Sequence, residues 1–192
     1  MKKIVCKEFG PVDDLVWEEG NSLEPQPNEV VIEIKSAALN FPDYLIVQGL
    51  YQIKPPLPFV PGNEGAGVIK KIGDDVVSHK VGDRVYFMSG IGAFAEEISL
   101  DQNQVFKMEN EMAFDVAASY QLAYGTSFHA LVQRANIASG DEVLVLGGSG
   151  GVGLAAIDIA KAFGARVIAA VSTNEKSKIC TESVSYTHLR AH

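Results

Sequence analysis

A strand, a glycine-rich turn and a helix follow one another between residues 143 and 165, and this order constrains the fold more than any other feature of the chain. Residues 143–146 form a continuous apolar run, which is typical of a strand buried on both faces of a parallel sheet. A helix is expected over 151–165, ending near Gly164, and a second strand over 166–172. Together they predict one βαβ unit and an α/β fold.

The turn between strand and helix has the pattern G-x-G-x-x-G. Glycines at these positions let the backbone approach a pyrophosphate, whose charge is favoured at the N-terminus of a helix. The alternative is a plain strand-to-helix turn in which the glycines serve packing alone. Because the pattern follows a buried strand and opens a helix, we interpret it as a dinucleotide site. The cofactor-binding residues predicted here are Gly148, Ser149, Gly150, Gly151, Val152 and Gly153.

The end of the second strand indicates which dinucleotide is bound. A site for NAD usually has Asp or Glu about 20 residues further on, where it binds the ribose 2′-hydroxyl. Here the strand runs into Ser172-Thr173-Asn174, and the first acid is Glu175 in the following turn. Ser172, Thr173 and Lys176 could instead contact a 2′-phosphate, so the sequence favours NADPH over NADH. The alternative for Lys176 is a solvated side chain in the first turn of a helix.

The first part of the chain is rich in strand signals. The Pro-rich segment 53–62 is expected to be an extended loop. Short alternating or apolar runs bounded by Gly and Asp predict strands over 29–39, 65–73, 82–89, 93–100 and 104–108. This spacing predicts a barrel-like, mostly antiparallel domain. The Ala-rich stretch 112–136 then predicts two helices broken near Gly125.

Composition excludes several classes of partner. The 192 residues carry a net charge of −8, and an acidic surface repels nucleic acid. No run approaches the roughly 20 apolar residues of a membrane helix, and the first ten residues lack the apolar core of a secretory signal. The two cysteines, Cys6 and Cys180, are far apart, which suits a reducing cytoplasm. We therefore expect a cytoplasmic protein with no membrane or nucleic-acid partner.

Several separate motifs together resemble the medium-chain dehydrogenase/reductase superfamily. They are "AALNFPDYLIVQGLYQ", "PPLPFVPGNEGAGVI", "GDRV", "YGTSFHAL" and "GDEVLVLGGSGGVGLAAI", in that order along the chain. The chain is most similar to the zinc-free quinone oxidoreductase (zeta-crystallin-like) branch. This resemblance implies a GroES-like β-barrel domain followed by a Rossmann domain, NADPH as the cofactor, and a homodimer.

The resemblance also bears on metal binding. The zinc-dependent branch has Cys where this chain has Asn40, and Gly-His-Glu where it has Gly62-Asn63-Glu64. A tetrahedral zinc site needs a cluster of thiolate or imidazole ligands, and His79 and His129 each stand alone in the sequence. We predict that the site holds no metal.

Without a Lewis acid, hydrogen-bond donors must stabilise the charge that builds on a carbonyl oxygen when hydride adds to an enone or quinone. The resemblance implies Asn40 and Tyr51 as the catalytic residues. Asn40 takes the place of a zinc ligand, and Tyr51 matches a tyrosine that donates or orients a proton in related enoyl reductases. The alternatives are a turn-capping Asn and an ordinary loop aromatic. Asp43 and Tyr44 are weaker candidates.

Three other positions have predicted roles. Thr126 matches a family threonine at the nicotinamide end of the cofactor, and its structural alternative is a helix N-cap after Gly125. Glu64 is expected to hold a loop by accepting backbone N–H bonds. The pair Glu96-Glu97 is expected on a strand with a solvated face.

The end of the chain does not continue this pattern. We expect domains over 1–120 (GroES-like, incomplete) and 121–183 (the start of a Rossmann domain, truncated), with 184–192 as a non-native tail. Back-translation of 184–192 resembles a transposon-end sequencing adapter, so His188, Arg190 and His192 are given no functional role. The tail is expected to lie outside the packed fold. The intact parent, rather than this fragment, is expected to be active.

The functional expectation is an NADPH-dependent oxidoreductase that transfers hydride to a small electrophile, a quinone or an activated alkene. One alternative in the same fold is an enoyl-thioester or haloacrylate-type enoyl reductase. A second, from another class, is a non-catalytic NADPH-binding protein of the crystallin kind.

Overall fold

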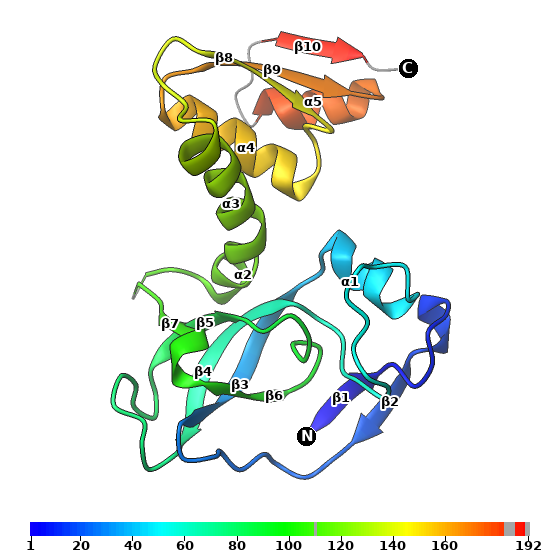
Figure 1. Cartoon of the computed structure of the whole chain (residues 1–192), viewed down its shortest axis with the longest axis vertical. Coiled ribbons are helices and arrows are strands. Elements are labelled where there is room, and N and C mark those ends of the chain that lie inside the picture. Colours follow the sequence, from blue (N-terminus) through cyan, green and yellow to red (C-terminus); the bar gives the residue numbers. More distant parts are fainter. Residues whose placement is uncertain (110, 183–186, 191–192) are drawn as a thin grey trace. The chain divides into compact units, whose positions relative to one another are not determined.

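The computed structural model describes residues 1–109, 111–182 and 187–190, and the chain divides into two compact units (Figure 1). Unit 1 spans Met1–Ser119, and unit 2 spans Tyr120–His192. Unit 1 is built on antiparallel sheets, and unit 2 is a parallel sheet with helices. The predicted α/β class is confirmed.

The centre of unit 1 is a five-stranded antiparallel sheet in the order β6-β3-β4-β5-β7. Alternation places Val30 and Ile32 of β3 in the core, where they pack with Val85 and Phe87 of β5. The strands are β3 (Glu29–Ala38), β4 (Glu64–Ile72), β5 (Arg84–Met88), β6 (Glu97–Asp101) and β7 (Val105–Lys107), with a 3-10 turn at Gln102–Gln104 before β7. The mostly antiparallel β domain is therefore confirmed.

Unit 1 also contains elements that the sequence reasoning missed. Strands β1 (Lys2–Val5) and β2 (Val16–Glu19) pair antiparallel, with a 3-10 turn at Val12–Asp14 between them. Helix α1 (Phe41–Val47) follows β3 directly. Its start carries a recognisable signal, because Asn40 is the N-cap, a proline follows within the first turn and Asp43 occupies the third helical position.

The acidic pair lies at the start of β6, where Glu97 is the first residue of the strand and Glu96 precedes it, and one of the two is solvated as expected. Glu96 is exposed, whereas Glu97 is buried and accepts hydrogen bonds from the Lys70 ammonium at 2.6 Å, the Ser22 hydroxyl and the Leu23 backbone N–H. Burial alone would raise the pKa of Glu97, but these hydrogen bonds outweigh it and lower the pKa to about 2. Glu97 therefore fastens the loop before β3 to the sheet.

The Ala-rich stretch forms two helices, as predicted, but the break between them lies at a different place. Helix α2 (Phe114–Ala118) closes unit 1 and packs with Ala66 and Met108 of its core. Helix α3 (Gln121–Phe128) opens unit 2 and runs into a π-helical segment at His129–Arg134. The break lies at residues 119–120, and the predicted break near Gly125 was wrong, because Gly125 lies inside α3 in a helical conformation.

Unit 2 is a parallel sheet in the order β10-β9-β8. One face packs on helices, with Ile157 and Cys180 contacting Val145 and Val167 in the same hydrophobic cluster. Gly164, with φ +78°, ends α4 as expected. The elements are β8 (Glu142–Leu146), α4 (Gly151–Ala162), β9 (Arg166–Val171), α5 (Asn174–Glu182) and β10 (Thr187–Arg190).

The expectation that residues 143–146 are buried on both faces was wrong. Val145 faces the helices and is buried, whereas Leu144 and Leu146 point the other way and are 55% and 74% exposed. Helices α4 and α5 both pack on the face that contains Val145. Within the described part of unit 2, neither of them covers the opposite face, to which Leu144 and Leu146 point.

The tail also differs from expectation where the structure describes it. Residues 187–190 form β10, which pairs in parallel with β9, so this stretch does not lie outside the fold. The edge of β9 away from β8 presents backbone N–H and C=O groups, and such an edge pairs with any extended segment. The rest of the predicted tail, 184–186 and 191–192, lies outside the described residues.

Replacing Glu97 with Gln should lower the free energy of unfolding by about 1–3 kcal/mol at pH 7, because a buried charged acceptor is lost. Since folding lowers the pKa of Glu97, its contribution is present above the ordinary value of 4.5 and is lost as the pH falls toward about 2. The two proteins should therefore converge in acid. Urea unfolding between pH 2 and 7, followed by Trp17 fluorescence, measures this. Glu33→Gln, which breaks the exposed pair with Lys35, is the control and should change little. A constant gap across this pH range would contradict the assignment.

Candidate functional site

A cavity of about 530 Å³ in unit 1 is the candidate substrate site. This volume is within the range of small-molecule pockets. Two of the lining residues, Asn40 and Asp43, are strongly polar, and Tyr44 adds a phenol. The other lining residues are aliphatic or aromatic: Ile4, Val12, Leu15, Leu39, Phe41, Val47 and Phe94. The cavity can therefore hold a mostly apolar molecule and form hydrogen bonds with a polar group on it.

The polar end of the cavity is held by a closed ring of hydrogen bonds between the starts of α1 and β4. The Asn40 backbone N–H donates to Asp43 Oδ2 at 2.8 Å, and Asn63 Nδ2 donates to Asp43 Oδ1 at 2.5 Å. The ring passes along the peptide bond from Asn63 to Glu64 and closes where Asn40 Nδ2 donates to Glu64 Oε1 at 2.8 Å. We call these four residues the Asn40 ring. It fixes both the backbone and the side chain of Asn40.

Asp43 is held within this ring. It is 2% exposed, and each of its carboxylate oxygens already accepts a hydrogen bond. Burial raises the pKa of Asp43, and the hydrogen bonds from Asn40 and Asn63 oppose that rise. Its position gives α1 an acid in its first turn, where the helix dipole favours negative charge.

The structure places Asn40 both at the N-cap of α1 and in the cavity wall, so the capping position is compatible with the predicted catalytic one. Glu64 is 1% exposed and holds the Asn40 amide. The expectation was that Glu64 is structural and accepts backbone N–H bonds; the structure adds the Asn40 side-chain amide as a donor, and acceptance from the backbone stays a prediction.

Tyr51 is partly buried and packs against a cluster of Cys6, Ile46, Val47 and Phe59. The cavity wall, as far as the chain is described, includes Tyr44 and not Tyr51. Tyr44 is 46% exposed and stacks on Phe41, with ring centroids 6.2 Å apart. The phenol nearest to Asn40 along the cavity wall therefore belongs to α1, in a helix that the sequence reasoning did not predict.

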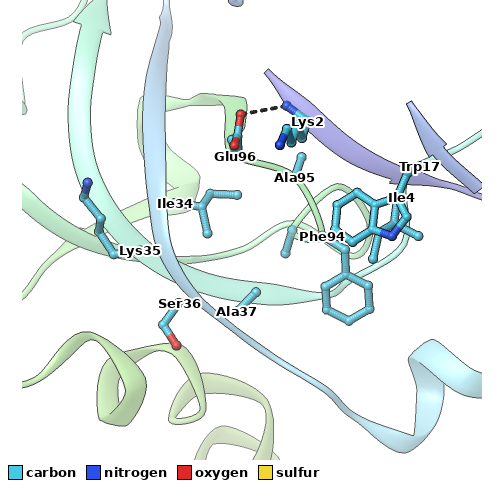
Figure 2. A pocket seen from close by; sticks show the side chains of 11 residues that line it. Lys2, Ile4, Trp17, Ile34, Lys35, Ser36, Ala37, Phe94, Ala95 and Glu96 are labelled. Carbon is cyan, nitrogen blue, oxygen red and sulfur yellow. Dashed lines mark hydrogen bonds between the residues drawn. The ribbon is translucent and has the colours of Figure 1, made fainter. Parts of the chain in front are cut away.

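A second hollow of about 390 Å³ lies in the same unit, and Figure 2 shows its lining side chains. Trp17, Ile4 and Phe94 gather at one end, and the Lys2 backbone N–H donates to Glu96 Oε2 at 2.7 Å near another. Ile4 and Phe94 also line the larger cavity. The described lining of this hollow does not include Asn40, whereas that of the larger cavity does, so the larger cavity is the candidate site.

In unit 2, the glycine loop connects β8 to α4. Leu154 donates the first helical N–H bond, to Gly150, which leaves the N–H groups of the preceding turn without an acceptor inside the helix. Gly153 must be glycine, because a Cβ there would meet the Gly147 carbonyl oxygen at 2.5 Å and Gly148 backbone atoms at 2.9 Å. The loop thus has the form of an anion site at a helix N-terminus.

Thr126 lies inside α3 and is exposed, so its predicted alternative as an N-cap after Gly125 was wrong. Helix α3 is tied to α4 by two hydrogen bonds, from the Ser127 hydroxyl to the Val152 carbonyl at 2.9 Å and from the Tyr124 hydroxyl to Asp158 at 2.9 Å. Burial, followed by the Asp158 carboxylate, raises the pKa of Tyr124. Thr126 is therefore adjacent to a residue that holds the glycine loop.

The end of β9 brings Ser172 and Lys176 together. Lys176 lies in the first turn of α5, where Lys176 Nζ donates to Ser172 Oγ at 3.3 Å and the Lys176 backbone N–H donates to Thr173 Oγ1 at 3.2 Å. Both side chains are exposed. Because β8 and β9 are parallel, this pair lies at the same edge of the sheet as the glycine loop.

The described ranges contain neither a cluster of possible metal ligands nor a helix that could span a membrane. No three His, Cys, Asp or Glu side chains come together there as possible metal ligands, and the absence of a metal stays a prediction. No helix in those ranges is long and apolar enough to cross a membrane.

Comparison with known proteins defines the class. Residues 26–110 match the alcohol dehydrogenase GroES-like domain. The chain is 37% identical to human quinone oxidoreductase over 185 residues, which cover 95% of this chain and 56% of that protein. It superimposes on Escherichia coli quinone oxidoreductase complexed with NADPH with a TM-score of 0.93 at 30% identity, covering 99% of this chain and 58% of the other. The CurK enoyl reductase is also similar, with a TM-score of 0.89 and 28% identity over 98% of this chain and 59% of the other.

A GroES-like unit followed by a glycine-loop βαβ unit, with these likenesses, shows that the chain belongs to the medium-chain dehydrogenase/reductase superfamily. Within that superfamily it is similar to the quinone oxidoreductases, as predicted. The chain spans about half the length of the curated relatives it matches.

Gly153→Ala should destabilise unit 2 by about 1–3 kcal/mol, because the added methyl group would meet backbone that cannot move aside. Gly151→Ala is the matched control in the same helical turn, where a Cβ meets nothing within 4 Å. This control should be neutral or stabilising by about 0.4–1 kcal/mol. Hydrogen exchange of peptides from α4 and β8 measures both effects. Equal protection in the two variants would show that the close approach is not needed for packing.

Proposed function

We propose that the protein represented by this chain is an NADPH-dependent oxidoreductase that reduces a quinone or an activated alkene. The observation that carries the proposal is the fixed amide of Asn40 at the polar end of an otherwise apolar cavity. The glycine loop of unit 2 supports the dinucleotide, and the solved quinone oxidoreductase that contains NADPH supports its identity.

Bound NADPH supplies a hydride to an electron-poor carbon of the acceptor. The apolar wall of the cavity would hold the acceptor. The Asn40 amide donates a hydrogen bond to the acceptor carbonyl, whose oxygen gains negative charge as the hydride adds. A tyrosine then provides or orients the proton. Tyr51 is the residue implied by the resemblance, and Tyr44 is the one that lines the cavity.

In unit 2, the backbone N–H groups at the start of α4 would hold the pyrophosphate, and Thr126 would contact the nicotinamide end. Ser172 and Lys176 would hold the 2′-phosphate, which supports NADPH over NADH. The Asn40 amide and a tyrosine hydroxyl of unit 1 would supply the hydrogen-bond donors in place of a metal ion, so the reaction that we propose is zinc-independent.

A second candidate function is the reduction of an enoyl thioester, and the likeness to the CurK enoyl reductase favours it. Non-catalytic NADPH binding is the third. A panel of quinones, enones and enoyl thioesters, with NADPH oxidation followed at each, separates the three. NADPH binding with no oxidation by any acceptor would leave the third.

The relatives are about twice as long as this chain, so the panel is applied both to the 192-residue chain and to a protein from the complete gene. We propose that only the longer form turns over, as a cytoplasmic homodimer. Activity of the 192-residue chain equal to that of the longer form would contradict this part of the proposal, and gel filtration of the longer form tests the dimer.

Lys176→Ala should weaken NADPH binding by about 5- to 10-fold, because a charged hydrogen-bond donor is lost, and should leave NADH binding almost unchanged. The dissociation constants for the two cofactors can be measured by the change in NAD(P)H fluorescence. Lys178→Ala, an exposed lysine on the same helix, is the control. Equal losses for both cofactors would contradict a 2′-phosphate site at Lys176.

A further inference from the structure

Glu64 occupies an unusually rigid position for a carboxylate beside a substrate cavity. It is the first residue of β4, and it pairs in register with Ala38 of β3 on one side and Met88 of β5 on the other. It is 1% exposed, and its Oε1 lies 2.8 Å from Asn40 Nδ2. A sheet neighbour on each side therefore fixes the backbone from which the carboxylate extends.

A carboxylate in contact with an amide decides how the amide is turned. Oε1 of Glu64 accepts the hydrogen bond from Asn40, and the two ends of an Asn amide differ, with an NH₂ group that donates and an oxygen that accepts. Only the NH₂ end of Asn40 can therefore face Glu64. The opposite orientation would place two acceptors against each other in a buried site, where an unpaired polar group is costly.

The same contact fixes the direction of the remaining donor. The Asn side-chain amide is planar and has two N–H bonds, and Glu64 uses one of them. The other N–H then has a single direction, set by the plane of the amide. The backbone of Asn40 cannot turn to change it, because Asp43 holds its N–H and Asn63 holds Asp43.

From this geometry we propose that Glu64 is a positioning residue, which orients the Asn40 amide so that its second N–H is presented to the carbonyl oxygen of the acceptor. This proposal rests on the proposed function of the Asn40 cavity. Glu64 acts through Asn40 and does not contact the acceptor. A single donor that is already oriented can raise kcat by a large factor, because the donor need not reorganise as charge develops on the carbonyl oxygen.

A direct test observes Asn40 without any turnover. The chain is labelled with ¹⁵N, and the NMR signals of the two Asn40 Nδ2 protons are assigned by their loss in Asn40→Ala. Cyclohexanone, a carbonyl compound with no reducible alkene, is then titrated in while the chemical shifts of these two protons are followed. One of the two protons should shift in the wild type and in Glu64→Gln, which keeps an acceptor. Neither should shift in Glu64→Met. No shift in the wild type would overturn the proposal, and this measurement needs no variant of Glu64 to fold.

Kinetics of the longer, active form provide the second test. Glu64→Met should lower kcat by about 10-fold or more with KM changed by less than about 3-fold, and Glu64→Gln should stay within about 3-fold of wild type. In an Asn40→Ala background, Glu64→Met should have no further effect, because the two residues act as one unit. The control is Glu33→Met, at an exposed glutamate on the adjacent strand, which should leave kcat unchanged.

Three results would overturn the positioning role. They are an unchanged kcat in Glu64→Met, additive losses in the double variant, or a loss in Glu64→Gln as large as in Glu64→Met while the Asn40 protons still respond to cyclohexanone. If no acceptor is reduced by any protein, the proposed function fails, and the cyclohexanone titration still decides whether Glu64 positions Asn40.

Discussion

The structure around the candidate site depends on the cost of burying two carboxylates, Asp43 and Glu64. A buried carboxylate is tolerated when donors surround it, and here the donors include the side-chain amides of two asparagines and the backbone N–H groups of the same two residues. Since each donor comes from the start of α1 or the start of β4, satisfying the charges also joins these two elements. The same hydrogen bonds keep Asn40 in one conformation, so stability and preorganisation have a single origin.

Local patterns predicted the parts of the fold that local physics decides. The alternation around Ile32 placed β3, and the glycine loop placed the turn before α4 and its anion-binding form. The burial of Glu97 was not predictable, because it depends on Lys70 and Ser22, which the fold brings from distant parts of the chain. A sequence pattern shows a charge but not the partner that makes its burial favourable.

At the candidate site, too, some features were predictable from the sequence and others were not. Asn40 was identified by resemblance, but the partner that orients it, Glu64, was expected to bind backbone, because 24 residues separate the two. The helical position of Tyr44 was missed although Asn40 and Asp43 form a capping pattern around Pro42. The stretch after the strand was instead interpreted as a loop. The wrong break at Gly125 has a similar cause, since glycine weakens a helix by only about 1 kcal/mol and the packing of α3 on α4 outweighs that.

The Asn40 ring closes within one uninterrupted stretch of chain, from Asn40 to Glu64. None of its hydrogen bonds requires a residue from unit 2. Exchange of this stretch as a cassette would therefore carry the whole ring with it, together with the part of the cavity wall formed by Asn40, Phe41, Asp43, Tyr44 and Val47, while the dinucleotide loop stays as it is. Grafting the cassette between related proteins is a route to new acceptor preferences that leaves cofactor preference untouched.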